Sequence, residues 1–462
     1  MGRVCVIGAG SSGVAACMAL HARSIAFDCF EAGSAVGGNW RYGNDNGMSS
    51  AYRSLHAVTS RNGMAYAALP MPDDYPDYPG HALVAKYLDD VVDYFGFRAM
   101  IQFKTDVCKV EQAAGGGWDV TVRQRDTGDT SVLHFSAVLV ATGHHWHPRY
   151  PEPLPGGGRF RGEQLHSHGY RSPQSFEGKR VLVVGAGNSA CDVAVDCSQV
   201  AARTLLAIRR GVHIMPKYLF GVPTDRLTLM RVGTRAPLWL QQMVVTSLVR
   251  VARGDLRRFG LPKPGHGLLS APPTVSDSLL SRVGHGDIVV KPAIDRFEGG
   301  DLVRFTDGST EPVDVVVYAT GYEVSFPFFD PSLFSTRYDG VRLYHRVVPP
   351  DLPGLYFIGL VQPVGAVMPV AEAQSEWVAD LLEGCAGLPS RAEMEREITR
   401  YRVVTTRRYP YCAHPIQVDF LAYQRELRRE RRRQRLATHP AARQLAGGVD
   451  QVAPERDAEV GL

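Results

Sequence analysis

Two glycine-rich segments carry the spacing that binds the pyrophosphate of a dinucleotide. The first box reads Gly8-Ala9-Gly10-Ser11-Ser12-Gly13, and the second reads Gly185-Ala186-Gly187-Asn188-Ser189-Ala190. In such a box the first glycine permits a tight turn. The second lets the backbone approach the pyrophosphate, and the third allows a helix to pack closely on a strand. The helix N-terminus that follows attracts negative charge. Two boxes in one chain therefore predict two bound dinucleotides.

Each box lies in the sequence context that this chemistry needs. An apolar run at 4–7 precedes the first box, a helical stretch at 14–22 follows it, and a second strand at 26–30 ends at Glu31. This order of strand, glycine turn, helix and strand is a βαβ unit. The same order recurs around the second box, with a strand at 181–184, a helix at 190–198 and a strand at 204–208.

The residue after the second strand of each unit indicates which dinucleotide binds. Glu31 lies 23 residues after Gly8, where a carboxylate accepts hydrogen bonds from ribose hydroxyls. The second unit carries Arg209 and Arg210 at this place, and guanidinium groups suit a 2′-phosphate. We therefore assign NADPH to the second box and FAD to the first. The alternative is that the two arginines are a solvated surface pair.

Two further strands indicate how the units are connected. Apolar runs at 138–140 and 315–317 each lead into Ala-Thr-Gly, which places Thr142-Gly143 before the second unit and Thr320-Gly321 after it. We expect an α/β fold of two doubly wound Rossmann-type domains, with the NADPH domain inserted into the FAD domain. The predicted FAD domain comprises 1–150 and 326–436. The NADPH domain is 151–325 with an insertion at about 218–264, and 437–462 is expected to be a mobile tail.

Composition excludes several other classes of protein. The chain has 462 residues, 45% of them hydrophobic, and a net charge of +4, which is too small to indicate a nucleic-acid partner. Its eight cysteines include no CxxC pair, so a dithiol or a zinc knuckle is not expected. No apolar run has membrane-spanning length, and 236–251 suggests an amphipathic helix. The first strand begins directly after Arg3, leaving no room for a signal peptide. We therefore expect a cytoplasmic protein without a membrane anchor.

A rarer pattern lies between the two boxes and narrows the class. Phe160-x-Gly162-x-x-x-His166-x-x-x-Tyr170 matches the identifying pattern of the flavin-containing monooxygenases, and the chain resembles that family from about residue 3 to residue 427. Related Baeyer–Villiger enzymes usually carry Trp-Pro where this chain has Tyr170-Arg171. The resemblance continues through Pro273-Thr274-Val275 and the segment 357–363, which ends in Gln362-Pro363.

The resemblance implies a fixed order of events. NADPH reduces FAD, the reduced flavin reacts with O2 to give a C4a-hydroperoxide, and the bound NADP⁺ shields this adduct. A small-molecule amine or sulfide substrate then takes the distal oxygen. Because the cofactor carries the chemistry, no side-chain acid or base needs to be aimed at the substrate. A homodimer is common in the family.

Cofactor contacts are assigned by motif match. Besides the box glycines, Glu31 and the two arginines, they are Ser12, Gly38, Asn39, Trp40, Thr142, Gly143, Asn188, Ser189, Thr320, Gly321, Gly359 and Gln362. The histidines at 144–147 follow an Ala-Thr-Gly turn, as a His-His pair does in the family. They have no carboxylate or cysteine at ligand spacing, so no metal is expected.

One position departs from the family pattern. The family usually has asparagine near the flavin and the nicotinamide where this chain has Val58, and valine cannot hydrogen-bond a peroxide. Either the hydroperoxide is less protected, or Thr59, Ser60 or His56 replaces the lost contact, or the asparagine is dispensable in this subgroup. We take Val58, Thr59 and Gln362 as the candidates nearest the reacting atoms. The rival functions are Baeyer–Villiger insertion, an NADPH oxidase that releases hydrogen peroxide, and a non-catalytic binding protein.

Overall fold

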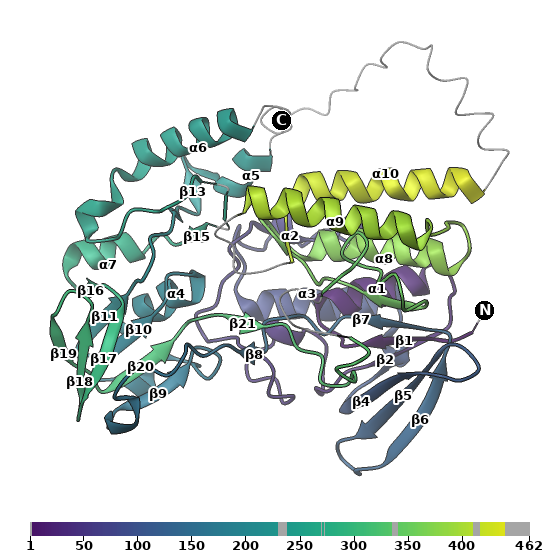
Figure 1. Cartoon of the computed structure of the whole chain (residues 1–462), viewed down its shortest axis with the longest axis horizontal. Coiled ribbons are helices and arrows are strands. Elements are labelled where there is room, and N and C mark those ends of the chain that lie inside the picture. Colours follow the sequence, from purple (N-terminus) through teal and green to yellow (C-terminus); the bar gives the residue numbers. More distant parts are fainter. Residues whose placement is uncertain are drawn as a thin grey trace.

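Two lobes make up the molecule, each built on a parallel sheet (Figure 1). The computed structural model describes residues 2–229, 238–268, 270–271, 273–334, 341–409 and 416–438. One lobe contains both the first 140 residues and the C-terminal helices of the described chain, and the other contains the middle of the chain.

The first lobe has the sheet order β22-β7-β1-β2-β3, with all neighbours parallel. Its strands are β1 (Val4–Ile7), β2 (Phe27–Phe30), β3 (Ile101–Gln102), β7 (Ala137–Val140) and β22 (Leu355–Phe357). The short strands β1, β2 and β7 are buried at every position, as expected of parallel strands covered on both faces, and Asp28 is the one charged residue among them. One face carries α1 (Ser11–His21), which packs against α3 (His81–Phe95) and α8 (Met368–Leu382). The other face meets the antiparallel sheet of β4 (Thr105–Gln112), β5 (Trp118–Gln124) and β6 (Thr130–Phe135).

The second lobe has the order β16-β11-β10-β20-β9, again parallel throughout. Its strands are β9 (Glu163–His166), β10 (Arg180–Val184), β11 (Arg203–Ala207), β16 (Ile288–Lys291) and β20 (Val315–Tyr318). Helices α4 (Asn188–Cys197) and α7 (Leu279–His285) share a core with one face. The sheet of β17 (Ile294–Gly299), β18 (Leu302–Phe305) and β19 (Thr310–Pro312) covers the other face.

The chain crosses between the lobes twice, and the two crossings are hydrogen-bonded to each other. The outgoing strand β8 (His147–Pro148) pairs antiparallel with the returning strand β21 (Tyr322–Glu323), and both lie between the lobes in Figure 1. The chain then re-enters the first sheet as β22, next to β7. The second lobe is therefore inserted into the first, as the paired Ala-Thr-Gly segments predict.

The remaining α-helices and strands lie outside the two parallel sheets. They are α2 (Arg61–Met64), β12 (Ile214–Met215), β13 (Tyr218–Leu219), β14 (Val222–Pro223), α5 (Thr224–Leu229), α6 (Leu238–Arg253), β15 (Thr274–Val275), β23 (Gln362–Pro363), α9 (Arg391–Arg408), β24 (Gln417–Val418) and α10 (Phe420–Thr438). None of the helices in the described ranges combines the length and apolar composition needed to cross a membrane. Within the predicted insertion, 230–237 lies outside the described residues, and so does 439–462 of the predicted tail.

The helices after the two boxes begin earlier than their apolar periodicity predicts. The sequence suggested starts at 14 and 190, whereas α1 begins at Ser11 and α4 at Asn188. Gly10 and Gly187 occupy the N-cap positions, so helical geometry starts directly after the box. Polar residues fill these first turns, which is why a search for apolar spacing misses them.

Candidate active site

The first glycine box brings the backbone of α1 against the end of β1. A Cβ atom on Gly13 would lie 1.8 Å from the carbonyl oxygen of Gly8, so no larger residue fits without moving the helix. Gly8 itself has φ +96°, the left-handed region that glycine tolerates. The amide of Gly8 donates to the carbonyl of Phe30 at 2.8 Å, which ties the turn to β2. The geometry matches the roles predicted for the first and third glycines of the box.

A second glycine pair packs directly on this box. Gly38 has φ +52°, and a Cβ there would lie 2.9 Å from Gly10 Cα. The amide of Gly37 donates to the carbonyl of Ala9 at 3.0 Å. Asn39, exposed, accepts hydrogen bonds from Ser50 at 2.7 Å and 2.9 Å, and Trp40 packs against the apolar core of this lobe. The segment 37–40 thus lies beside the first glycine box.

Glu31 lies at the end of β2 with its carboxylate turned toward the box. The side chain is buried, and Oε2 accepts from the amide of Ala9 at 2.7 Å. Oε1 accepts from the amide of Gly33 at 2.7 Å and from Asn46 Nδ2 at 3.2 Å. Each carboxylate oxygen has further lone pairs, so these bonds hold the acid in place and leave it able to accept from a ribose hydroxyl.

The end of β22 also reaches the first box. A Cβ on Gly359 would meet the Ser12 hydroxyl at 1.9 Å, and the amide of Gly359 donates to Gln374 on α8 at 2.8 Å. Residues far apart in sequence, Ser12 and Gly359, are thus in contact at the N-terminus of α1. Three residues later, the backbone amide of Gln362 donates to the carbonyl of Ile416 at 2.8 Å.

The second glycine box has the same arrangement of a turn between a strand and a helix, with a few differences. Gly185 has φ +143°, and a Cβ there would lie 2.5 Å from the carbonyl oxygen of Ala319 in the second Ala-Thr-Gly segment. Ala190 is fully buried and fills the place of the third glycine. A Cβ on Gly187 would meet no atom within 4 Å, so the box is open there.

Contacts from β15 brace the start of α4. Asn188 Oδ1 accepts from the amide of Val275 at 2.8 Å, and the Thr274 hydroxyl donates to the carbonyl of Ala186 at 2.7 Å. The Pro273-Thr274-Val275 motif therefore supports the glycine turn. Ser189 follows on the first turn of α4 and is half-buried. Arg209 and Arg210 are both exposed, directly beyond the end of β11.

The pattern that runs from Phe160 to Tyr170 has a structural role at each fixed position. Phe160 packs on Phe297 with ring centres 4.8 Å apart. A side chain on Gly162 would overlap the Phe160 ring and approach the carbonyl of Asp314 to 2.6 Å. His166 ends β9, and its ring contacts Tyr322 of the returning crossing at 5.3 Å. Burial lowers the pKa of His166 to about 4.

Tyr170 belongs to a buried polar network between the lobes. Its hydroxyl donates to Asp196 Oδ2 at 3.0 Å, and the Ser54 hydroxyl of the first lobe donates to the same oxygen. One turn earlier on α4, Asp192 accepts from the Tyr52 hydroxyl at 2.5 Å. Burial raises the pKa of both carboxyls. The Tyr-x-Ser segment at 52–54 therefore binds the helix that begins at the second box.

Comparison with known proteins identifies the family that has this arrangement. The family model described as flavin-binding monooxygenase-like matches residues 1–434. The chain belongs to this family. Flavin-containing monooxygenase 5 of Cavia porcellus is 36% identical to the enzyme over 444 residues, which cover 92% of this chain and 82% of that protein. Flavin-containing monooxygenase 3 of Homo sapiens is 33% identical over 440 residues, with the same coverage.

Solved structures agree with this assignment. The S-allyl-L-cysteine S-oxygenase from Allium sativum superimposes on the enzyme with a TM-score of 0.69 at 25% identity, covering 97% of this chain and 94% of that chain. The open crystal structure of cyclohexanone monooxygenase gives a TM-score of 0.67 at 17% identity, covering 93% and 97%, and supports the fold alone. The enzyme is an FAD- and NADPH-dependent oxidoreductase of the monooxygenase class.

The residues of the first lobe fit a bound flavin dinucleotide. The cradle formed by Gly8, Gly10 and Gly13 has no room for a Cβ at its third glycine, and the N-terminus of α1 faces it. Thr142 Oγ1 and Gln362 Oε1 are buried and have no hydrogen-bond partner in the described chain. Such atoms are costly unless a ligand or water satisfies them. The Thr142 and Gln362 side chains therefore suit contacts to a cofactor.

The segment 58–60, which includes Val58, contacts α5 of the second lobe. Val58 is 37% exposed, while Thr59 and Ser60 are buried. The Ser60 amide and hydroxyl donate to Asp225 Oδ2 at 3.0 Å and 2.6 Å. In the described residues, the amide and hydroxyl of Ser60 thus donate to α5 rather than to either glycine box. Sequence reasoning did not anticipate Asp225, because no motif marks it.

Proposed function

We propose that the enzyme uses NADPH and O2 to oxygenate nitrogen or sulfur in a small organic substrate. The observation that carries the proposal is the family pattern from Phe160 to Tyr170, together with Tyr170-Arg171 at the place where Baeyer–Villiger enzymes usually carry Trp-Pro. The similarity to an S-oxygenase over 97% of the chain supports the same chemistry. Arg171 is itself fixed, since it donates to the carbonyls of His168 at 2.6 Å and Ser49 at 3.2 Å.

In this proposal the protein supplies binding and orientation. When both cofactors are bound, FAD reduced by NADPH would activate O2, and O2 would be the source of the transferred oxygen atom. The first glycine box holds the FAD pyrophosphate, Glu31 its ribose, and Thr142 and Gln362 complete the contacts. The second box holds the NADPH pyrophosphate, and Arg209 and Arg210 hold the 2′-phosphate. The network of Tyr170, Asp196 and Ser54 fixes one site relative to the other.

Product analysis tests the reaction class. Purified enzyme with NADPH and O2 is given a dialkyl sulfide in one reaction and a cyclic ketone in the other. We expect the sulfoxide and no lactone, because a sulfide is a soft nucleophile that attacks an electrophilic oxygen. Lactone as the dominant product would contradict the proposal and support Baeyer–Villiger insertion. Hydrogen peroxide in amounts equal to the NADPH consumed, with both substrates unchanged, would support an oxidase.

Val58 is the residue that favours the alternative function, an NADPH oxidase that releases hydrogen peroxide. We expect Val58→Asn to lower the hydrogen peroxide released per NADPH consumed without substrate, because an amide restores a hydrogen-bonding group at this place. Val132→Asn is the matched control, since Val132 is an exposed valine on the outer β6 strand. Equal peroxide release by wild type and Val58→Asn would show that the asparagine is dispensable in this enzyme.

A further inference from the structure

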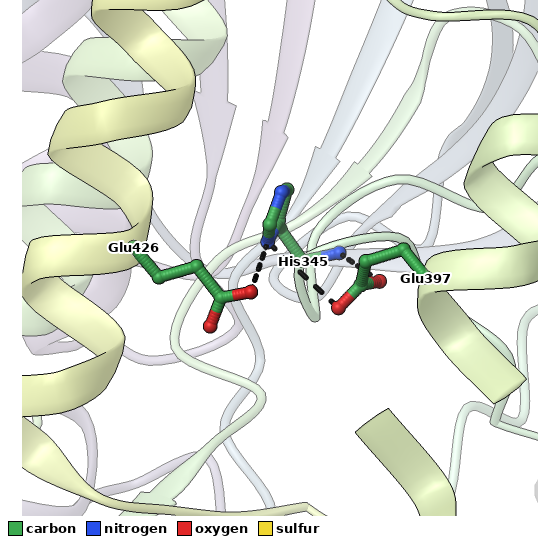
Figure 2. Close-up of side chains that lie close together, drawn as sticks. All are labelled: His345, Glu397 and Glu426. Carbon is green, nitrogen blue, oxygen red and sulfur yellow. Dashed lines mark hydrogen bonds and ion pairs between the residues drawn. The ribbon is translucent and has the colours of Figure 1, made fainter. Parts of the chain in front are cut away.

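Three side chains outside both glycine boxes converge near the C-terminal helices. His345 lies in the segment that leads to β22, Glu397 on α9 and Glu426 on α10 (Figure 2). His345 Nδ1 is 3.5 Å from Glu426 Oε1 and 3.9 Å from Glu397 Oε1. One nitrogen and one oxygen from each carboxylate lie within 4.8 Å of one another. Figure 2 shows the imidazole between the two carboxylates.

The imidazole nitrogen that faces the carboxylates is unsatisfied. The His345 side chain is only 6% exposed, and Nδ1 has no hydrogen-bond partner in the described chain. Buried polar atoms of native proteins normally have a partner, and an exception calls for an explanation. His345 also has φ +44° and Arg346 φ +62°, a left-handed pair that is unusual for residues with a side chain. Such backbone persists where the surroundings enforce it, and it is concentrated at functional positions.

A second layer of contacts orients the His345 and Glu397 side chains. Arg346 Nη2 donates to both Glu397 oxygens at 3.1 Å and 3.0 Å. His345 Nε2 faces Glu430 Oε2 at 3.9 Å, and Glu430 is held by Arg433 at 2.6 Å and Gln434 at 2.7 Å. A carboxylate beside the far ring nitrogen is the usual support of a metal-binding histidine, since it leaves the near nitrogen with its lone pair.

We propose that His345, Glu397 and Glu426 bind one divalent first-row transition-metal ion. One imidazole and two carboxylates form a mixed nitrogen and oxygen donor set, which suits Mn²⁺, Fe²⁺ or Zn²⁺ better than Ca²⁺ or Mg²⁺. The Glu426 side chain is 31% exposed and gives an ion access from solvent. The bound ion links α9 and α10 to the segment that enters the first sheet. Its role is structural, and the inference is independent of the proposed oxygenation.

Titration with Mn²⁺ alone tests the site. The FAD-loaded enzyme is freed of metal with a chelator, and electron paramagnetic resonance measures the Mn²⁺ left free in solution. Mn²⁺ is chosen because Cys108 is an exposed thiol, and thiolates bind Zn²⁺ strongly. We expect one bound Mn²⁺ per chain. His345→Gln and Glu426→Gln should weaken binding by about tenfold or more.

A matched control separates this site from an ordinary His–carboxylate pair. His134 Nδ1 lies 2.9 Å from Asp119 Oδ1 on the exposed face of β5 and β6, so His134→Gln should leave the bound Mn²⁺ unchanged. Each variant must retain the wild-type FAD content. If His345→Gln loses FAD, the test rests on Glu426→Gln.

Thermal unfolding gives a second readout. Mn²⁺ should raise the unfolding midpoint of the wild type and leave that of His345→Gln or Glu426→Gln unchanged. Absence of bound Mn²⁺ in the wild type would overturn the proposal and favour a buried histidine–carboxylate cluster that binds no ion. Equal binding by wild type and both variants would overturn it as well, because the ion would then lie elsewhere.

Discussion

Individual glycines set how closely a dinucleotide approaches this fold. At Gly13 the obstacle to a side chain is backbone, the Gly8 carbonyl at 1.8 Å from an added Cβ, and a backbone atom cannot rotate away. We expect Gly13→Ala to weaken FAD binding by about tenfold or more, because the start of α1 must shift. Absorbance of the purified protein gives FAD per chain. Gly115→Ala is the control, since a Cβ there meets nothing within 4 Å, and an equal loss of FAD in both variants would contradict the prediction.

The two arginines after β11 are placed to select NADPH over NADH. Arg209 and Arg210 are exposed at the end of β11, next to the second box. We expect Arg209→Ala or Arg210→Ala to raise the KM for NADPH by about tenfold or more, since a charged hydrogen bond to phosphate is lost, and to leave the KM for NADH unchanged. Steady-state oxidation of each nucleotide measures both constants. Arg391→Ala, on α9, serves as the control. If the pair is only a solvated surface feature, neither constant will change.

At the scale of elements, α4 serves two purposes. Its N-terminus follows the second glycine box, and its Asp192 and Asp196 side chains bind Tyr52 and Ser54 of the other lobe. Both carboxyls lie at the interface between the lobes, where burial raises their pKa. The helix that binds a dinucleotide is therefore also the helix that holds the two lobes in register.

This arrangement predicts a pH dependence of stability with a defined sign. A carboxyl whose pKa is raised by folding stabilises the folded state fully below its ordinary pKa of about 3.9, and this stabilisation is lost as the pH rises through the raised value. Asp192→Asn removes the titration and keeps an acceptor for Tyr52. Measured between about pH 4 and about pH 7, the thermal stability of the variant relative to wild type should therefore increase with pH. Asp129→Asn, at an exposed turn, is the control, and a constant difference across this range would refute the prediction.

At the scale of the whole molecule, the paired crossings connect the two lobes. Arg149 Nη2 and Nε donate to the carbonyl of Thr320 at 2.8 Å and 3.2 Å, and the Thr320 hydroxyl donates back to the carbonyl of Arg149 at 2.5 Å. Each Ala-Thr-Gly segment precedes one end of this two-stranded ribbon. The ribbon is short, so side-chain bonds of this kind contribute a large part of its stability.

We expect Arg149→Ala to loosen the ribbon without unfolding either lobe. Hydrogen–deuterium exchange of the amides of His147, Arg149 and residues 320–323 should become about tenfold faster, because two hydrogen bonds from a charged group are lost. Exchange in β1 and β10 should be unchanged. Arg123→Ala, which removes an exposed ion pair with Asp106 on β4, is the matched control. Unchanged exchange in the ribbon would show that backbone pairing alone holds the crossings.

Local sequence patterns determined a large part of the fold of this protein. The two boxes, Glu31, and the Ala-Thr-Gly pair predict two Rossmann units with one inserted into the other, because glycine spacing, strand length and helix position are local properties of the chain. The strands predicted around both boxes agree with β1, β2, β10 and β11 to within a residue at each end. The family pattern could likewise be read from sequence, since its positions are spaced by a single strand and turn.

Only the tertiary structure brought distant residues together. Ser12 meets Gly359, Tyr52 meets Asp192, and His345 meets Glu426, and no local signal marks any of these pairs. The energy of each contact arises from burial, which depends on how the lobes and the C-terminal helices pack. Sequence periodicity reports which face of one element is apolar. It does not report which polar group of another element is buried against it, and that pairing is decided by the assembled fold.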